Sequence, residues 1–293
     1  MSRECCIVQR AGIATTVQDL GRPGLAHLGV PRSGAADRRA AASANRLVGN
    51  APGAALLETS GELELRIVHD CWLAATGADA RLSIDGRDRD TGRSVFVPRG
   101  SDVRLHAPVS GLRNYLAFDG GIIGKPVLGS LSTDTLSGIV PLVIESGVTL
   151  RTGAATGEPV FIDPLPQRRS DSIEIFPGPR TTWCTTESMS RMITDDWIVG
   201  DDVNRIGIRL DGPPMSRAVH GEVPSEGLVR GAVQLLPTGG IIVMLADHPV
   251  TGGYPVIAVV ADDGVDALAQ CRPGERVRFR RSSAAWQVAV SVH

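Results

Sequence analysis

Three side chains of different chemistry lie close together near the start of the chain. Gln18, Asp19 and Arg22 supply an amide, a carboxylate and a guanidinium within the glycine- and proline-containing segment 15–24. Because glycine admits a positive φ and a close approach, and proline fixes φ, this segment predicts a rigid loop that orients a small amide or acid. The residue types leave a structural alternative equally open, a turn in which the Asp19 carboxylate caps backbone amides.

A second set of polar residues lies in glycine-rich segments of the carboxyl-terminal half. Ser225 and Glu226 precede a glycine, and the apolar run 241–246 leads into Asp247 and the turn segment 251–255. Glu226 and Asp247 are candidates for a general base and an orienting group, since a carboxylate in a partly dry pocket can have a raised pKa. The structural alternative is a tight turn capped by Asp247.

Composition and spacing exclude several classes of function. The net charge is −2, and the 30 basic and 32 acidic residues are spread along the chain, which argues against nucleic-acid binding. Lys125 is the only lysine, so Schiff-base, pyridoxal or biotin-carrier chemistry would have to use it, and its surroundings do not resemble a biotinylated hairpin. The segment 120–126 fails as a phosphate-binding loop, because Asp119 and Pro126 stand where that motif needs Gly and Ser or Thr.

Signatures of nucleophilic and metal catalysis are missing from the sequence. No G-x-S-x-G segment occurs, and the six histidines show no zinc-ligand spacing, so we expect no bound metal and no covalent cofactor on this chain. His27 and His248 lie in glycine-rich loops and are the histidines worth testing. The five cysteines are odd in number and lack C-x-x-C spacing, which favours a reducing, cytoplasmic location over a disulfide framework.

Short apolar runs separated by turn residues indicate a mainly β fold with a few short helices. Strands are expected at 63–68, 72–75, 81–84, 94–97, 103–106, 115–118, 143–144, 148–150, 172–175 and 241–246. Helical periodicity covers 37–48 and, more weakly, 187–193 and 263–270. The 293 residues allow two domains, and the polar, proline-bearing segment 163–171 predicts the connection between a lobe at 1–165 and a lobe at 172–293.

A series of motifs spans nearly the whole chain. The first half contains TTVQDLGRPG, GVPRSGAADR, ANRLVGN, ALLE, YLAFDGG and VLGSLSTD, and the second half contains FPGPR, NRIGIRLDGPP, SEGLVRGAVQ, LLPTGG and TGGYP. In this order the motifs resemble the KipA/PxpC family, also called allophanate hydrolase subunit 2 or the second carboxyltransferase domain of urea carboxylase. The resemblance implies two cyclophilin-like β-barrel lobes.

The resemblance also implies a function that depends on partners. Bacterial members are similar to the C subunit of the ATP-dependent 5-oxoprolinase, which converts 5-oxoproline to glutamate. Such a protein would line part of a lactam pocket and be inactive alone. It would work beside a KipI/PxpB-type subunit, which is similar to allophanate hydrolase subunit 1, and a PxpA-type subunit. The assembled complex would use ATP. Two alternatives remain open. One is the carboxyltransferase component of a biotin-dependent urea or amide carboxylase, and the other is a KipA-like regulatory protein that binds a KipI-like kinase inhibitor.

The motifs supply the candidate site residues. Asp19, Glu226 and Asp247 are the expected catalytic residues. The expected substrate-binding residues are Gln18, Arg22, Asn45, Glu58, Ser225, Gln234, Gly252, Gly253 and Tyr254. The chain departs from the family pattern in two places: His248 and Pro249 replace Arg and Gln, and 137–141 replaces a glycine-rich stretch. If that Arg contacts an anionic substrate in the family, the departure implies a different substrate or reduced activity.

Overall fold

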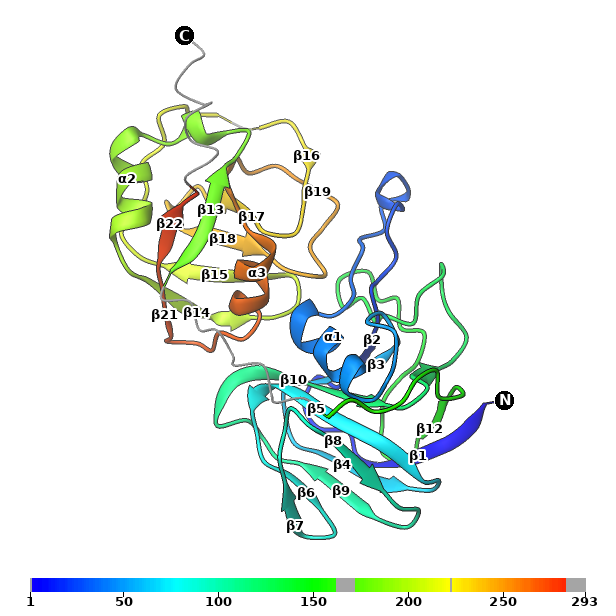
Figure 1. The fold of residues 1–293 in the computed structure, drawn as a ribbon. Helices are drawn as coiled ribbons and strands as arrows, with labels where there is room; N and C mark the ends of the chain where they lie inside the picture. The colour runs from blue at the N-terminus through cyan, green and yellow to red at the C-terminus, as the bar shows by residue number, and fades with distance from the viewer. Residues whose placement is uncertain (1, 162–171, 222, 283–293) are drawn as a thin grey trace. The chain divides into compact units, whose positions relative to one another are not determined.

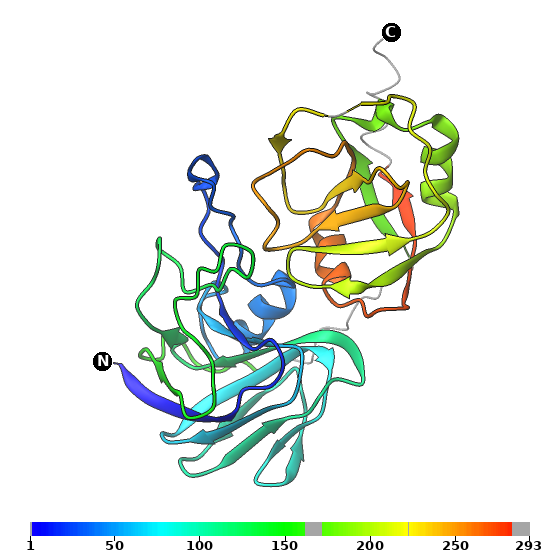
Figure 2. The same ribbon diagram turned by 180° about the vertical axis from the view of Figure 1, so that it is seen from behind.

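The computed structural model describes residues 2–161, 172–221 and 223–282. The chain divides into two compact units, each with its own hydrophobic core, and Figures 1 and 2 show them from opposite sides. The predicted connection at 163–171 lies outside the described residues. None of the described helices has the length and apolar character needed to cross a membrane.

The first unit is built from two antiparallel sheets among its described residues. One sheet has the order β11 (Ile122–Ile123), β12 (Thr149–Thr152), β1 (Arg3–Arg10), β4 (Leu63–Ile67), β9 (Asp102–Leu105), β6 (Leu82–Ile84) and β7 (Arg87–Arg89). The other has the order β2 (Thr16–Gln18), β3 (Leu56–Thr59), β10 (Ser110–Phe118), β5 (Cys71–Asp79) and β8 (Ser94–Val97). In β4 and β9, buried apolar residues alternate with more exposed polar ones, so one face of each strand packs into the core and the other stays polar.

A β-bulge explains the adjacent cysteines near the amino terminus. In the pairing of β1 with β12, Glu4 lies opposite Arg151 and Cys6 lies opposite Leu150, so β1 carries one extra residue. This break in the alternation allows both Cys5 and Cys6 to be buried. All of the chain's cysteines lie among the described residues and are free thiols, which agrees with the prediction against a disulfide framework.

Helix α1 (Arg38–Leu47) confirms the strongest helical prediction. It begins at Asp37, whose side chain accepts a hydrogen bond from the Ala40 amide at 2.8 Å. Its small buried residues, among them Ala41 and Ala44, allow it to pack closely against β5 and β10. Residues 25–31 lie outside the first compact unit and carry the short helix η1 (Ala26–Leu28).

The second unit contains a sheet whose edges meet. Its order is β21 (Arg276–Val277), β14 (Trp197–Val203), β15 (Gly207–Asp211), β18 (Ile241–Met244), β17 (Ala232–Leu235), β20 (Val256–Val260), β13 (Ile173–Pro177) and β22 (Phe279–Arg281). Only Arg278 separates β21 at one edge from β22 at the other, so the sheet must curve round into a barrel. The unit also contains η2 (Thr181–Trp183), α2 (Thr186–Thr194), α3 (Asp262–Leu268) and the strand pair β16 (Glu226–Gly227) and β19 (Thr251–Gly252).

The predicted fold class, mainly β with barrel lobes and few short helices, is confirmed. The two weaker helical predictions correspond to α2 and α3. The strand expected at 143–144 is wrong, because this segment belongs to no described strand. Ile144 is nevertheless buried and joins the first core, so it anchors a loop, whereas Val143 is exposed.

Two loop segments of the first unit run alongside each other. The Arg22 amide donates to the Arg32 carbonyl at 2.8 Å, and the Ala35 amide donates to the Asp19 carbonyl at 3.1 Å. Gly34 makes this approach possible with a φ of 89°. A Cβ at Gly34 would lie 2.9 Å from the Leu20 carbonyl carbon, so the approach depends on the missing side chain.

Replacing Gly34 with Ala is therefore expected to destabilise the protein more than replacing Gly29 with Ala. Both glycines have a positive φ, at 89° and 76°, so both variants carry the cost of a left-handed L-residue. No heavy atom lies within 4 Å of a Cβ at Gly29, which makes it a matched control. Urea unfolding should show an additional loss of roughly 1–3 kcal/mol for Gly34→Ala. Equal losses would contradict the close loop contact.

Candidate functional site

The Asp19 carboxylate joins two loops of the first unit. One oxygen, Oδ1, accepts from the Gly21 amide at 2.7 Å, the Ser130 hydroxyl at 2.6 Å and the Ser132 hydroxyl at 2.5 Å. The other oxygen accepts from the Leu131 amide at 2.8 Å. These contacts are those of the structural alternative, a carboxylate that caps backbone amides. A catalytic role for Asp19 stays a prediction.

Gln18 and Arg22 flank this carboxylate and are both buried. The Gln18 amide nitrogen donates to the Thr16 hydroxyl at 3.0 Å and to the Thr133 carbonyl at 3.1 Å, while Arg22 donates to the Ser132 carbonyl. The Gln18 side-chain oxygen is buried and accepts no hydrogen bond from any described group. Gln18 also borders a cavity of about 10 Å³. Its side-chain carbonyl is thus an acceptor that needs a donor.

Asn45 and Glu58 stabilise the same part of the first unit through hydrogen bonds. The Asn45 amide nitrogen donates to the Ala54 carbonyl at 2.8 Å, and its oxygen accepts from Asn50 at 3.0 Å. Glu58 accepts from the Ala36 amide at 2.9 Å. Both side chains are buried, so the motifs that contain them hold α1 and its flanking loops in place.

In the second unit, Glu226 pairs with Arg180. The Arg180 Nε lies 2.9 Å from Glu226 Oε1, and Arg180 also lies over the Trp183 ring, 5.8 Å from its centroid. The side chains remain 36% and 27% exposed, so both can reach a ligand. Hydrogen bonding from the Arg180 guanidinium lowers the pKa of Glu226. The expected upward shift of its pKa is therefore wrong.

The glycine-rich turn near Tyr254 lies beside this ion pair. Gly252 is the register partner of Glu226, and a Cβ at Gly252 would lie 2.7 Å from the Gln234 Nε2. Gln234 is buried and donates to the Tyr254 carbonyl at 3.1 Å. The other residues predicted here, Ser225, Gly253 and the Tyr254 side chain, are exposed. The structure thus brings most of the predicted second-unit residues together around one turn.

Asp247 has a different environment. It is fully buried and forms a two-pronged ion pair with Arg205, whose Nε lies 2.9 Å from Oδ2 and whose Nη2 lies 3.0 Å from Oδ1. Asp247 and Glu226 therefore each have their own arginine. The sequence prediction included neither arginine among the site residues, although both occur in motifs that it quoted. The buried pair fits a structural role.

The histidines that the sequence singled out show no metal-binding environment. His248 is buried, with its Nδ1 2.8 Å from the Pro249 carbonyl, and His27 is exposed. Among the described residues, no group of three or more His, Cys, Asp and Glu side chains is placed to hold a metal ion. The expectation of a metal-free chain stays a prediction.

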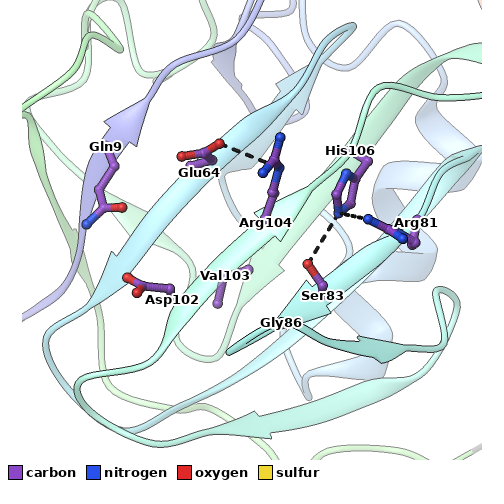
Figure 3. Close-up of a pocket in the computed structure, with 9 residues that line it drawn as sticks. All are labelled: Gln9, Glu64, Arg81, Ser83, Gly86, Asp102, Val103, Arg104 and His106. Atoms are coloured by element: carbon purple, nitrogen blue, oxygen red, sulfur yellow. Dashed lines mark hydrogen bonds and ion pairs between the residues drawn. The ribbon is translucent and has the colours of Figure 1, made fainter.

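A further cavity contains none of the predicted residues. This sheet pocket has a volume of about 330 Å³ and lies on the polar face of the seven-stranded sheet (Figure 3). Its lining residues are Gln9, Glu64, Arg81, Ser83, Gly86, Asp102, Val103, Arg104 and His106. Most of them are separated in sequence and meet only through strand pairing, so motif analysis gave no signal for the sheet pocket.

Comparison with known proteins supports the motif analysis. The sequence profile of the family described as "Carboxyltransferase domain, subdomain A and B" matches residues 28–281. The chain is 36% identical over 279 residues to the 5-oxoprolinase C subunit of Escherichia coli, a match that covers 94% of this chain and 90% of that protein. It is 30% identical over 298 residues to the urea amidolyase of Saccharomyces cerevisiae, covering 92% of this chain but 16% of that protein.

Structural comparison gives the same result for the fold. The solved structure of TTHA0988 matches with a TM-score of 0.85 and 33% sequence identity. The match covers 94% of this chain, and this chain spans about half, 55%, of that structure's length. The likeness therefore extends over nearly all of the present fold.

Replacing Asp247 with Asn should strongly destabilise the protein, because Arg205 would stay buried without its carboxylate. We expect the free energy of unfolding to fall by about 3–5 kcal/mol. Asp211→Asn is the matched control, since Asp211 lies 3.7 Å from Arg209 in an exposed pair and should cost less than about 1 kcal/mol. Urea denaturation of both variants measures the difference. Similar losses would contradict the structural role of the buried pair.

Proposed function

Because this chain belongs to the family described as carboxyltransferase domain, subdomain A and B, we propose that it is the C subunit of a multi-subunit, ATP-dependent 5-oxoprolinase. This enzyme would open the lactam of 5-oxoproline with ATP and water to give glutamate. The observation that carries the proposal is the 36% identity to the C subunit of a bacterial 5-oxoprolinase, over 94% of this chain and 90% of that protein. The chain would line part of the substrate pocket and be inactive alone.

The partly exposed pair of the second unit suits the recognition of a lactam. Arg180 supplies guanidinium donors for a developing negative charge on the lactam oxygen, and Glu226 holds that guanidinium in place at 2.9 Å. The pKa of Glu226 is lowered by Arg180, so Glu226 is ionised at neutral pH and can accept a proton but not donate one.

ATP would supply the phosphoryl group that activates the lactam oxygen in the assembled enzyme. The glycine-rich segment 120–126 does not fit a phosphate loop, because Asp119 is already engaged with Arg3 at 2.7 Å and with the Trp72 amide at 2.9 Å. We therefore assign ATP binding to the partner subunits, of the KipI/PxpB type and the PxpA type. The free thiols of the chain suit a complex in the reducing cytoplasm.

A second candidate function is the carboxyltransferase step of a biotin-dependent urea or amide carboxylase. The 30% identity to the yeast urea amidolyase favours it, and that match covers 92% of this chain. Biotin would have to come from a separate carrier, because Lys125 is the only lysine and lies in Gly-Lys-Pro. The same guanidinium and carboxylate would then hold a planar amide during transfer of the carboxyl group.

Reconstitution with partner subunits distinguishes the two functions. We expect the chain, co-purified with its PxpA-type and KipI/PxpB-type partners, to release glutamate from 5-oxoproline only when ATP is present. The chain alone should release none. A parallel reaction with urea, bicarbonate, ATP and biotin-loaded carrier domain is the control. A well-assembled complex that carboxylates urea and leaves 5-oxoproline intact would contradict the 5-oxoprolinase proposal.

Within that complex, Glu226→Gln should reduce kcat/KM by about two orders of magnitude or more, since it removes a proton acceptor. The pKa of Glu226 lies below its ordinary value of 4.5, so the activity that depends on its ionisation should be constant from about pH 5.5 to 8 and decline only in stronger acid. Glu187→Gln, at an exposed position on α2, is the control. Full activity in Glu226→Gln would exclude its catalytic role.

A further inference from the structure

The sheet pocket gathers chemically distinct side chains from neighbouring strands (Figure 3). Arg104 comes from β9, Ser83 from β6 and Glu64 from β4, while Arg81 precedes β6 and His106 follows β9. Strand pairing places Ser83 opposite Arg104 and Glu64 opposite Arg104. A volume of about 330 Å³ is at the lower end of the range for small-molecule sites. The dimensions therefore suit a small solute.

The contacts of His106 fix its protonation state. Its Nε2 lies 3.0 Å from Arg81 Nη2 and 3.3 Å from the Ser83 hydroxyl, as the dashed lines of Figure 3 show. A guanidinium can only donate hydrogen bonds, so Nε2 must accept and carry no proton. The proton of the neutral ring is then on Nδ1, which lies 3.8 Å from Glu62 Oε1.

A protonated His106 would place two donors against each other. Its Nε2–H would point at the Arg81 guanidinium, and both groups would be positively charged. The surroundings of the ring also disfavour its protonated form. Burial, Arg81 and Arg104 lower the pKa of His106, and together they outweigh the opposite effect of Glu62 and Asp88. If the direct 3.0 Å contact between Arg81 and His106 opens, an anion that bridges the two groups would accept from both and remove the repulsion.

The carboxylates around the sheet pocket are already paired with arginines. Glu62 pairs with Arg10 at 2.6 Å and Glu64 pairs with Arg104 at 3.5 Å. Asp102 pairs with Arg66 at 2.8 Å. Asp88 lies 3.7 Å from Arg81. Protonation of His106 therefore adds one positive charge to a local set in which these opposite charges are matched. One added positive charge suits a monoanion, whereas the nearby carboxylates would repel a dianion.

We propose that the sheet pocket binds a small monocarboxylate, with its oxygens held by Arg81, His106 and the Ser83 hydroxyl. Two oxygens of one carboxylate match two adjacent donors, and Ser83 adds a third donor from the floor of the pocket. Binding favours the protonated ring, so the complex takes up a proton and the affinity rises as the pH falls toward 5.5. This site is separate from the Arg180–Glu226 pair and does not depend on the 5-oxoprolinase proposal.

The test is an NMR titration of the His106 ring in the intact chain. With sodium acetate as the probe, we expect the pKa of His106 to rise by about one unit, and the apparent dissociation constant to fall several-fold between pH 7.5 and pH 5.5. Sodium chloride at equal ionic strength should leave the pKa nearly unchanged. Phosphate at pH 7.5, where it is largely a dianion, should bind more weakly than acetate.

Variants separate this site from general anion effects. Arg81→Gln should abolish the acetate-dependent shift, and Ser83→Ala should weaken it several-fold while the ring still titrates. Arg46→Gln, at an exposed position on α1, should behave as the parent. An equal shift with chloride, tighter binding of phosphate, or an unchanged acetate effect in Arg81→Gln would each overturn the proposal. These results are independent of glutamate release by the reconstituted complex.

Discussion

The need to hydrogen-bond carboxylates that are partly or fully withdrawn from water governs the arrangement of the loops in this protein. An ionised carboxylate that loses its donors in the interior destabilises a fold by several kcal/mol. Half-buried Asp19 meets this need with the Leu131 amide and two serine hydroxyls that are more than a hundred positions away in sequence. Fully buried Asp247 meets it with Arg205. Each carboxylate therefore joins two chain segments, and the polar motifs acquire a fixed geometry that an apolar core alone would not specify.

Solvent exposure distinguishes the ion pair that stabilises the fold from the ion pair that a ligand can contact. Arg205 and Asp247 are 7% and 0% exposed, whereas Arg180 and Glu226 are 36% and 27% exposed. The two pairs use the same functional groups, but only the second has surface that a substrate can reach. The barrel explains this difference, because β16 and β19 form a separate strand pair outside the eight-stranded sheet of the described residues. Glu226 lies on that pair.

The sequence predicted the strands and helices that depend on local patterns. It did not predict contacts between segments that are distant in the chain. The short apolar runs at 63–68 and 103–106 and the helical periodicity of 37–48 are local, and the structure contains β4, β9 and α1 there. The residues at 143–144 have the composition of a strand but no partner in the described sheets. Glycine-rich motifs located Glu226 and Asp247, yet no pattern in the sequence shows which arginine each one contacts. The lining of the sheet pocket was equally hidden, because it depends on the register between β4, β9 and β6.

Nearly all basic residues of the chain are arginines, and this affects the protonation of neighbouring groups in each of the two units. A guanidinium stays charged at every pH relevant to a folded protein, so the neighbouring group must change its own protonation equilibrium. Beside Arg180 a carboxylate is stabilised in its charged form, and the pKa of Glu226 falls. Burial, together with Arg81 and Arg104, destabilises the charged form of an imidazole, and the pKa of His106 falls as well. Neighbouring arginines thus favour an ionised acceptor in the second unit and, together with burial, a neutral ring in the first. Of these two groups, the ring is the one that is neutral and can gain a proton, and a bound anion would favour that gain.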